Sequence, residues 1–123
     1  MLQEPTILLI NDQVHLRDFI KYILMDKYRV ASAGGLEEAF YYMAASPVHL
    51  VLLDAKVARL DGIAILEEIK KKYPDIEVIM LTAYASIETI HKAFKLGAFG
   101  FLMKPFDLDK FIATVDEALA FRH

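Results

Sequence analysis

The sequence contains no cysteine, and this absence excludes several kinds of site at once. A disulfide framework, a thiolate zinc site and a thiol nucleophile all require cysteine. No apolar run approaches the roughly 18 residues that a membrane span needs, and the opening residues lack the basic and apolar regions of a signal peptide. We therefore expect a soluble cytoplasmic protein that makes no membrane contact.

The sequence also lacks a basic stripe and any internal repeat. Its net charge is only −3 with the histidines neutral, and its lysines and arginines are scattered along the chain. Because a nucleic-acid-binding surface gathers positive charge, we expect this domain not to bind nucleic acid directly. The four histidines, His15, His49, His91 and His123, show no spacing typical of a site and are interpreted as surface or packing residues.

Length and composition indicate one globular unit. The chain has 123 residues, of which 56% are hydrophobic and 25% are charged. This length suffices to bury one sheet-centred core and hardly two. We therefore expect a single domain over residues 1–123.

Five short segments are predicted to be strands. Continuous apolar runs, which suit strands buried on both faces, cover Thr6–Ile10, Val48–Leu53 and Val78–Leu81. Tyr28–Ala33 and Phe99–Met103 are weaker candidates. The three continuous runs lack the polar alternation of a strand with one solvent-exposed face.

Segments with helical spacing separate and follow the strands. Apolar residues recur at helical intervals in Val14–Leu24 and Leu108–Leu119, and helices are also plausible near residues 36–46, 62–73 and 85–97. Five repeats of strand then helix predict an α/β fold: a doubly wound, five-stranded parallel sheet with five helices on its two faces.

The predicted helix ends carry recognised signals. Pro74 follows the third helix, Gly97 follows the fourth, and Asp107 is expected to be the N-cap of the fifth.

Polar side chains stand where the predicted strands end. Asn11 and Asp12 follow the first strand, Asp54 ends the third, Thr82 ends the fourth and Lys104 follows the fifth. One Asp after a strand is more often a turn or capping residue than a functional one. The carboxyl ends of the strands form the functional edge of such sheets, so two carboxylates, a hydroxyl and an ammonium together indicate a site.

This set of groups suits phosphoryl transfer to a carboxylate. Two close carboxylates repel each other unless a cation intervenes, and hard oxygen ligands favour Mg²⁺. An Asp can act as a nucleophile and form an acyl phosphate. Catalysis then consists mainly of placing charge and donors on the phosphoryl oxygens, for which Lys104 and Thr82 are available.

Five stretches of the sequence resemble bacterial response-regulator receiver domains: Ile7–Asp12, Leu50–Asp54, Leu60–Gly62, Leu81–Ala83 and Lys104–Phe106. They occur in the order of that family and cover essentially the whole chain. The resemblance implies the CheY-like, flavodoxin-like strand order 2-1-3-4-5. It also implies a phosphoacceptor regulator of a two-component phosphorelay, similar to receivers of transcriptional activators or hybrid kinases. Such a regulator assists only its own phosphorylation and dephosphorylation and is not otherwise an enzyme.

The resemblance also assigns roles to single residues. It implies that Asp54 is the phosphoacceptor and that Thr82 and Lys104 contact the phosphoryl oxygens. The implied Mg²⁺ ligands are Asp12, Asp54, the main-chain carbonyl of Lys56 and, through water, Asn11.

Signal output is implied to involve the fifth strand. Thr82 and Phe101 would be the switch residues, although ordinary packing explains Phe101 equally well.

A histidine kinase or phosphotransfer protein would dock at the first helix. The face of the fourth helix, fifth strand and fifth helix would bind an output domain or a second copy, with the candidate contacts Tyr84, Ile87, Phe106 and Phe111. The family commonly has a cis peptide bond before Pro105.

Two residues depart from the family pattern. Asn11 stands where the family usually has a second acid, which predicts weaker Mg²⁺ binding with the site retained. The Lys56 side chain either leans over the site and alters the lifetime of the acyl phosphate, or is simply solvated.

Two other classes of function remain as alternatives. A receiver-like interaction module that no longer depends on phosphorylation would also explain the weakened acidic pocket. A flavin-binding flavodoxin-like protein or an aspartate-nucleophile phosphatase fits poorly, because Asp12 would repel a flavin phosphate and Val14 occupies the place of the second phosphatase Asp.

Overall fold

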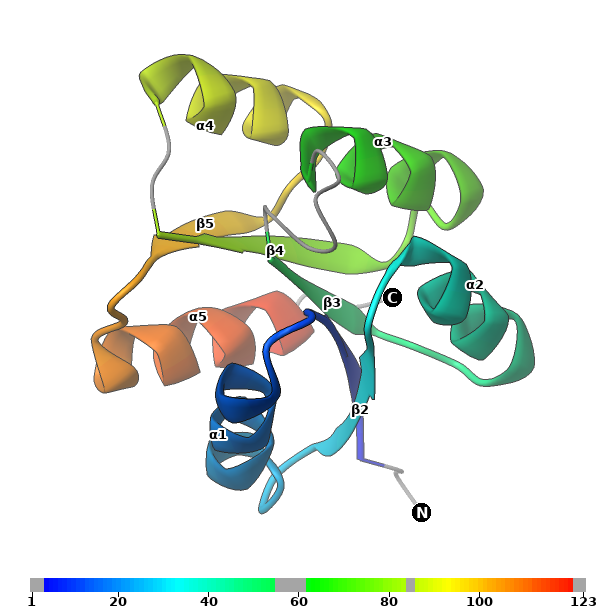
Figure 1. The fold of residues 1–123 in the computed structure, drawn as a ribbon, viewed down its shortest axis with the longest axis vertical. Coiled ribbons are helices and arrows are strands. Elements are labelled where there is room, and N and C mark those ends of the chain that lie inside the picture. Colours follow the sequence, from blue (N-terminus) through cyan, green and yellow to red (C-terminus); the bar gives the residue numbers. More distant parts are fainter. Residues whose placement is uncertain (1–3, 55–61, 84–85, 121–123) are drawn as a thin grey trace.

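The computed structural model describes residues 4–54, 62–83 and 86–120 (Figure 1). Within these ranges strand and helix alternate five times, as the sequence predicted. The strands are β1 (Thr6–Ile10), β2 (Arg29–Ala33), β3 (Leu50–Asp54), β4 (Glu77–Thr82) and β5 (Gly100–Met103). The helices are α1 (Val14–Leu24), α2 (Leu36–Ala45), α3 (Gly62–Lys72), α4 (Ile87–Lys95) and α5 (Leu108–Ala120).

The strands form one parallel sheet with the order β2-β1-β3-β4-β5, which confirms the predicted fold and strand order. The direction of winding reverses between β1 and β3, the two neighbours at the centre of the sheet. Ile10 pairs with Leu53 across this boundary. Asn11 and Asp54, the next residue of each segment, therefore reach the carboxyl edge at the same level.

Helices cover both faces of the sheet: α1 and α5 lie on one face, and α2, α3 and α4 lie on the other (Figure 1). The cause is the alternation of side chains along each strand, since neighbours point to opposite faces. Leu8 and Ile10 pack with α2 and α3, whereas Ile7 and Leu9 pack with α1 and α5. Both faces are apolar, which explains the continuous apolar runs in the sequence.

Helix ends follow local sequence signals. Asp107 Oδ1 accepts a hydrogen bond from the Lys110 N–H at 3.3 Å, so the predicted N-cap is confirmed. Helix α4 is shorter than the predicted 85–97, since Ser86 caps its start by accepting from the Thr89 N–H at 3.1 Å. Gly97 follows the helix with a φ of 103°, a conformation that favours glycine. No helix among the described residues has the length and apolar character of a membrane span.

Phe111 corrects one expectation about the surface. It was a candidate for the exposed output face, but only 2% of the residue is exposed. The apolar stripe of α5 faces the sheet and carries Phe111 into the core, where its ring stacks on Phe106 with the centroids 5.4 Å apart. Of the two, only Phe106 keeps a partly exposed side chain.

Candidate functional site

The candidate site lies at the carboxyl edge of the sheet, where β1, β3, β4 and β5 end side by side. The winding reverses at this edge between β1 and β3, and ligands of open α/β sheets bind at such a crevice. Three of the predicted site residues, Asn11, Asp54 and Lys104, meet there through direct hydrogen bonds. They come from three different strand ends, so the fold itself assembles the site.

Asp54 is the centre of this group. It is the last residue of β3 and is only 5% exposed. Its Oδ2 accepts a hydrogen bond from Asn11 Nδ2 at 2.8 Å and another from Lys104 Nζ at 2.8 Å. A buried carboxylate requires such partners, because burial without them costs several kcal/mol.

Lys104 reaches Asp54 from the end of β5. Its main-chain N–H donates to the Thr82 carbonyl at 2.6 Å, which ties the residue to the end of β4. The predicted cis peptide bond between Lys104 and Pro105 is confirmed. The Lys104 side chain is 22% exposed, so the ion pair lies at the mouth of the site and is only partly screened by water.

Asn11 is the most deeply buried polar residue of the site, with an exposure of 0%. Its main-chain N–H donates to the Ala33 carbonyl at 3.0 Å, which continues the pairing of β1 with β2. Its side-chain Oδ1 accepts from the Gln13 N–H at 2.6 Å, and its Nδ2 donates to Asp54. Both ends of the amide are therefore hydrogen-bonded.

The available oxygen donors fit Mg²⁺. This cation commonly keeps several waters and is held by one or two carboxylates. Asp12 and Asp54 provide two, and Asp12 is exposed to solvent directly after the end of β1. The described residues contain no cluster of three or more His, Asp or Glu side chains suited to a metal.

A family model of the response regulator receiver domain matches residues 7–116. This match spans nearly all of the chain. The chain belongs to the response regulator receiver domain family. It is thus a receiver domain of the kind found in two-component systems.

Curated relatives of this receiver domain include regulatory proteins that are much longer than this chain. It is 39% identical over 118 residues to the transcriptional regulatory protein ZraR of Escherichia coli (strain K12), which covers 95% of this chain and 27% of ZraR. It is 33% identical over 116 residues to the nitrogen assimilation regulatory protein NtrX of Azorhizobium caulinodans, which covers 92% of this chain and 26% of NtrX. The chain thus spans about a quarter of the length of these relatives.

Solved receiver structures share the fold. The receiver domain of NtrX from Brucella abortus is 36% identical, with a TM-score of 0.86 over 94% of this chain and 98% of that one. A CheY-like receiver domain protein from Methanospirillum hungatei JF-1 is 28% identical, with a TM-score of 0.89 over 96% of this chain and 95% of that one.

The two predicted switch residues of the receiver domain lie on adjacent strands. Thr82 is the last residue of β4, is 2% exposed, and pairs with Met103 of β5. Phe101 lies two residues before Met103 and is half-buried against the core on the α2, α3 and α4 side. This position suits both a switch and ordinary packing.

Two predicted residues, Lys56 and Tyr84, lie outside the described residues. The carbonyl of Lys56 was expected to bind the metal, and Tyr84 was a candidate for the output face. Ile87 of that face is 85% exposed, and Met103 and Leu108 are 47% and 44% exposed. The face formed by α4, β5 and α5 therefore carries exposed apolar side chains.

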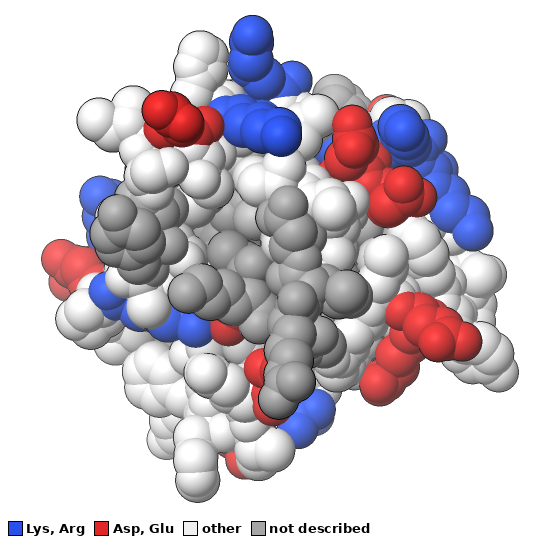
Figure 2. Space-filling view, turned by 45° about the horizontal axis from the view of Figure 1, so that its top comes forward, with Lys and Arg blue, Asp and Glu red and all other residues white. Residues whose placement is uncertain are grey.

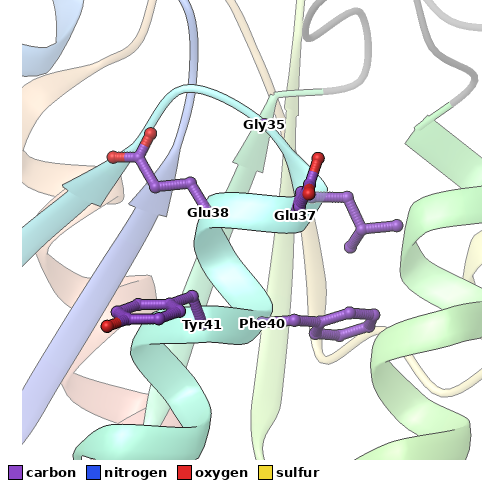
Figure 3. A pocket seen from close by; sticks show the side chains of 6 residues that line it. Gly35, Glu37, Glu38, Phe40 and Tyr41 are labelled. Atoms are coloured by element: carbon purple, nitrogen blue, oxygen red, sulfur yellow. The ribbon is translucent and has the colours of Figure 1, made fainter.

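Two other surface features have no evident link to the site. In Figure 2 basic and acidic side chains are interspersed, and among the described residues of that view neither sign forms a continuous stripe. Figure 3 shows the Phe40 and Tyr41 side chains on opposite sides of α2. A hollow of about 890 Å³ lies beside the start of this helix. It is lined by Gly35, Leu36, Glu37, Glu38, Phe40 and Tyr41, none of which belongs to the carboxyl-edge site.

Sequence reasoning missed the part played by Gln13, whose main-chain N–H fixes the orientation of the Asn11 amide. The signal was present in the sequence. Asn side chains commonly accept a hydrogen bond from the main chain two residues later, especially before a helix. Applied to Asn11, this tendency points to Gln13, the residue that precedes α1.

Proposed function

We propose that this receiver domain accepts a phosphoryl group on Asp54 from the phosphohistidine of a sensor kinase or phosphotransfer protein. The observation that carries the proposal is the buried Asp54 carboxylate with Lys104 Nζ at 2.8 Å from its Oδ2. A carboxylate nucleophile beside a fixed ammonium group, at the carboxyl edge of the sheet, suits phosphoryl transfer.

The transfer needs no general base, because the nucleophile is already an anion. A carboxylate oxygen of Asp54 forms a bond to phosphorus while the bond from phosphorus to the imidazole nitrogen breaks, and that nitrogen keeps the electron pair. Lys104 supplies positive charge and Thr82 a hydroxyl donor to the phosphoryl oxygens. Preorganised donors of this kind stabilise the charge of the transition state.

Mg²⁺ would be held by Asp12, Asp54 and the main-chain carbonyl of Lys56, with Asn11 reaching it through water. When bound, Mg²⁺ supplies positive charge that offsets the carboxylates and the incoming phosphoryl group.

Phosphorylation would then be read at the face formed by α4, β5 and α5. Thr82 would move toward the phosphoryl group and Phe101 would turn inward. The hydrogen bond from the Lys104 N–H to the Thr82 carbonyl, at 2.6 Å, supports a coupled movement of β4 and β5. The altered face would bind an output domain or a second copy.

On this proposal the protein is a cytoplasmic regulator whose residues 1–123 form one receiver domain, and it catalyses only its own phosphorylation and dephosphorylation. The alternative of a phosphorylation-independent interaction module is not supported by the family match or by the relatives. The retained pair of Asp54 and Lys104 also argues against it.

The test is to incubate the protein with acetyl phosphate and Mg²⁺ and to measure the mass of the intact protein. We expect one added phosphoryl group on the parent and none on the Asp54→Asn variant. Beryllofluoride with Mg²⁺ should change the fluorescence or NMR spectrum of the parent only. A parent protein that shows neither response contradicts the proposal.

A further inference from the structure

The orientation of the Asn11 side chain is fixed by its surroundings. The residue is 0% exposed, and its main chain is held by the Ala33 carbonyl. A main-chain N–H can only donate, so the atom 2.6 Å from the Gln13 nitrogen must be the amide oxygen. The amide nitrogen is consequently the atom that lies 2.8 Å from Asp54 Oδ2.

Asn11 and Lys104 converge on the same oxygen of Asp54. Both donor nitrogens are 2.8 Å from Oδ2, one from the end of β1 and the other from the end of β5. The Asn11 bond is wholly buried, whereas the Lys104 ammonium lies at the mouth of the site. The neutral amide is thus the interior support of the carboxylate.

An Asp at position 11 would change only one of the two contacts of the Asn11 side chain. A carboxylate oxygen still accepts from the Gln13 N–H, so that contact is retained. Toward Asp54, however, the amide donor would be replaced by a second negative oxygen at hydrogen-bond distance. Two buried carboxylates this close repel each other unless a cation or a proton lies between them.

We propose that Asn11 is a positioning residue, which holds the Asp54 carboxylate in place in the domain before any cation binds. The site is thereby assembled by protein donors alone, and Mg²⁺ adds to a preformed arrangement. The functional meaning of this inference rests on the proposed role of Asp54 as the phosphoacceptor. The hydrogen bond between Asn11 and Asp54 is independent of that role.

The decisive experiment is a double-mutant cycle measured in EDTA without a phosphodonor. It compares urea unfolding of the parent, Asn11→Asp, Asp54→Asn and the double variant. With Asp54 intact, Asn11→Asp should lower the folding equilibrium constant by about tenfold or more. In the Asp54→Asn background the same change should cost little or stabilise, since the amide and the carboxylate have merely exchanged places.

The effect of Mg²⁺ on thermal stability provides a second test of the Asn11 proposal. Adding Mg²⁺ should raise the melting temperature of Asn11→Asp more than that of the parent, because only the variant has a buried carboxylate at hydrogen-bond distance from Asp54, and a cation would relieve the repulsion between the two. Equal effects of Asn11→Asp in both backgrounds, or equal Mg²⁺ shifts, would overturn the proposal.

NMR keeps the proposal testable in case Asn11→Asp does not fold. The side-chain NH₂ of Asn11 should exchange slowly with water in the parent and faster in Asp54→Ala. Unchanged exchange would also overturn the inference.

Failure of the Asn11 proposal can be distinguished from failure of the proposed function. A protein that is phosphorylated on Asp54 but shows no coupling refutes only the role of Asn11. A protein that shows the coupling but accepts no phosphoryl group refutes only the phosphoacceptor function.

Discussion

The hydroxyl group of Tyr28 donates a hydrogen bond to Asp116 Oδ1, across 88 positions of sequence. The other oxygen of the same carboxylate lies 3.1 Å from Lys27 Nζ. Through these contacts Asp116 joins the segment before β2 to helix α5. Tyr28 is part-buried, whereas the Lys27 side chain is 63% exposed, so the tyrosine provides the stronger link.

Replacing Tyr28 by Phe should destabilise the domain. The substitution removes a hydrogen bond to a charged group, and we expect the free energy of unfolding to fall by about 1–2 kcal/mol. Urea unfolding measures this. Tyr22→Phe is the matched control, since Tyr22 is 72% exposed and should tolerate the change. Equal stability of the two variants would refute a stabilising role for the Tyr28 hydroxyl.

Removing the ammonium group beside Asp54 should slow phosphorylation. Lys104→Met keeps an unbranched side chain of nearly the same length but loses the charge 2.8 Å from Asp54. We expect the rate of phosphorylation by acetyl phosphate to fall by about 100-fold, as for the loss of one preorganised donor. Stopped-flow fluorescence or intact mass gives the rate. The control is Lys95→Met, an exposed substitution on α4 that should be phosphorylated at the rate of the parent. If Lys104→Met were phosphorylated at the same rate as these two proteins, the ammonium group would be dispensable.

Replacing Asn11 by Asp should strengthen Mg²⁺ binding. Asn11→Asp adds one negative charge next to Asp12 and Asp54, and the affinity of such oxygen sites rises with ligand charge. We expect the dissociation constant for Mg²⁺ to fall by roughly tenfold. Isothermal titration calorimetry provides the measurement, and Asp12→Asn should show the opposite change. An Asn11→Asp variant that binds Mg²⁺ no more tightly than the parent would contradict the prediction.

Gly97 should not tolerate alanine. Its φ of 103° is strained for a residue with a side chain, and an added Cβ would lie 3.0 Å from Lys70 Cε. We expect a loss of about 1–2 kcal/mol of unfolding free energy, measured in urea. Gly35→Ala is the control, because a Cβ there meets nothing within 4 Å. The prediction fails should both alanine variants be equally stable.

The sequence was sufficient for the order of the elements. Buried strands such as β1 and β3 are continuous apolar runs, and the end of α4 shortly before Gly97 follows from local backbone preference. These signals are local, so inspection of neighbouring residues recovers them. They also placed Asn11, Asp54 and Lys104 at one edge, because strands of a parallel sheet all end on the same side.

The details that the sequence did not provide depend on distant contacts. Whether Phe111 faces solvent or the sheet depends on the rotation of α5, which is set by packing against strands far away in sequence. The hydrogen bond from Asn11 to Asp54 is a second detail that depends on a distant contact. An Asn amide can present either its oxygen or its nitrogen, and the choice is made by the Gln13 N–H together with a partner 43 positions away.

Asn11 and Lys104, which both donate to Asp54, lie 43 and 50 positions from it in sequence. A chain that has paired β1 with β3 but has not yet added β5 therefore holds the carboxylate without its ammonium partner. Both contacts close long loops, which is costly in entropy, so both depend on the pairing of distant strands. On the proposed function, a partly folded chain is a poor phosphate acceptor. On that proposal, the ability to accept a phosphoryl group depends on β5 being in place as well as β1 and β3.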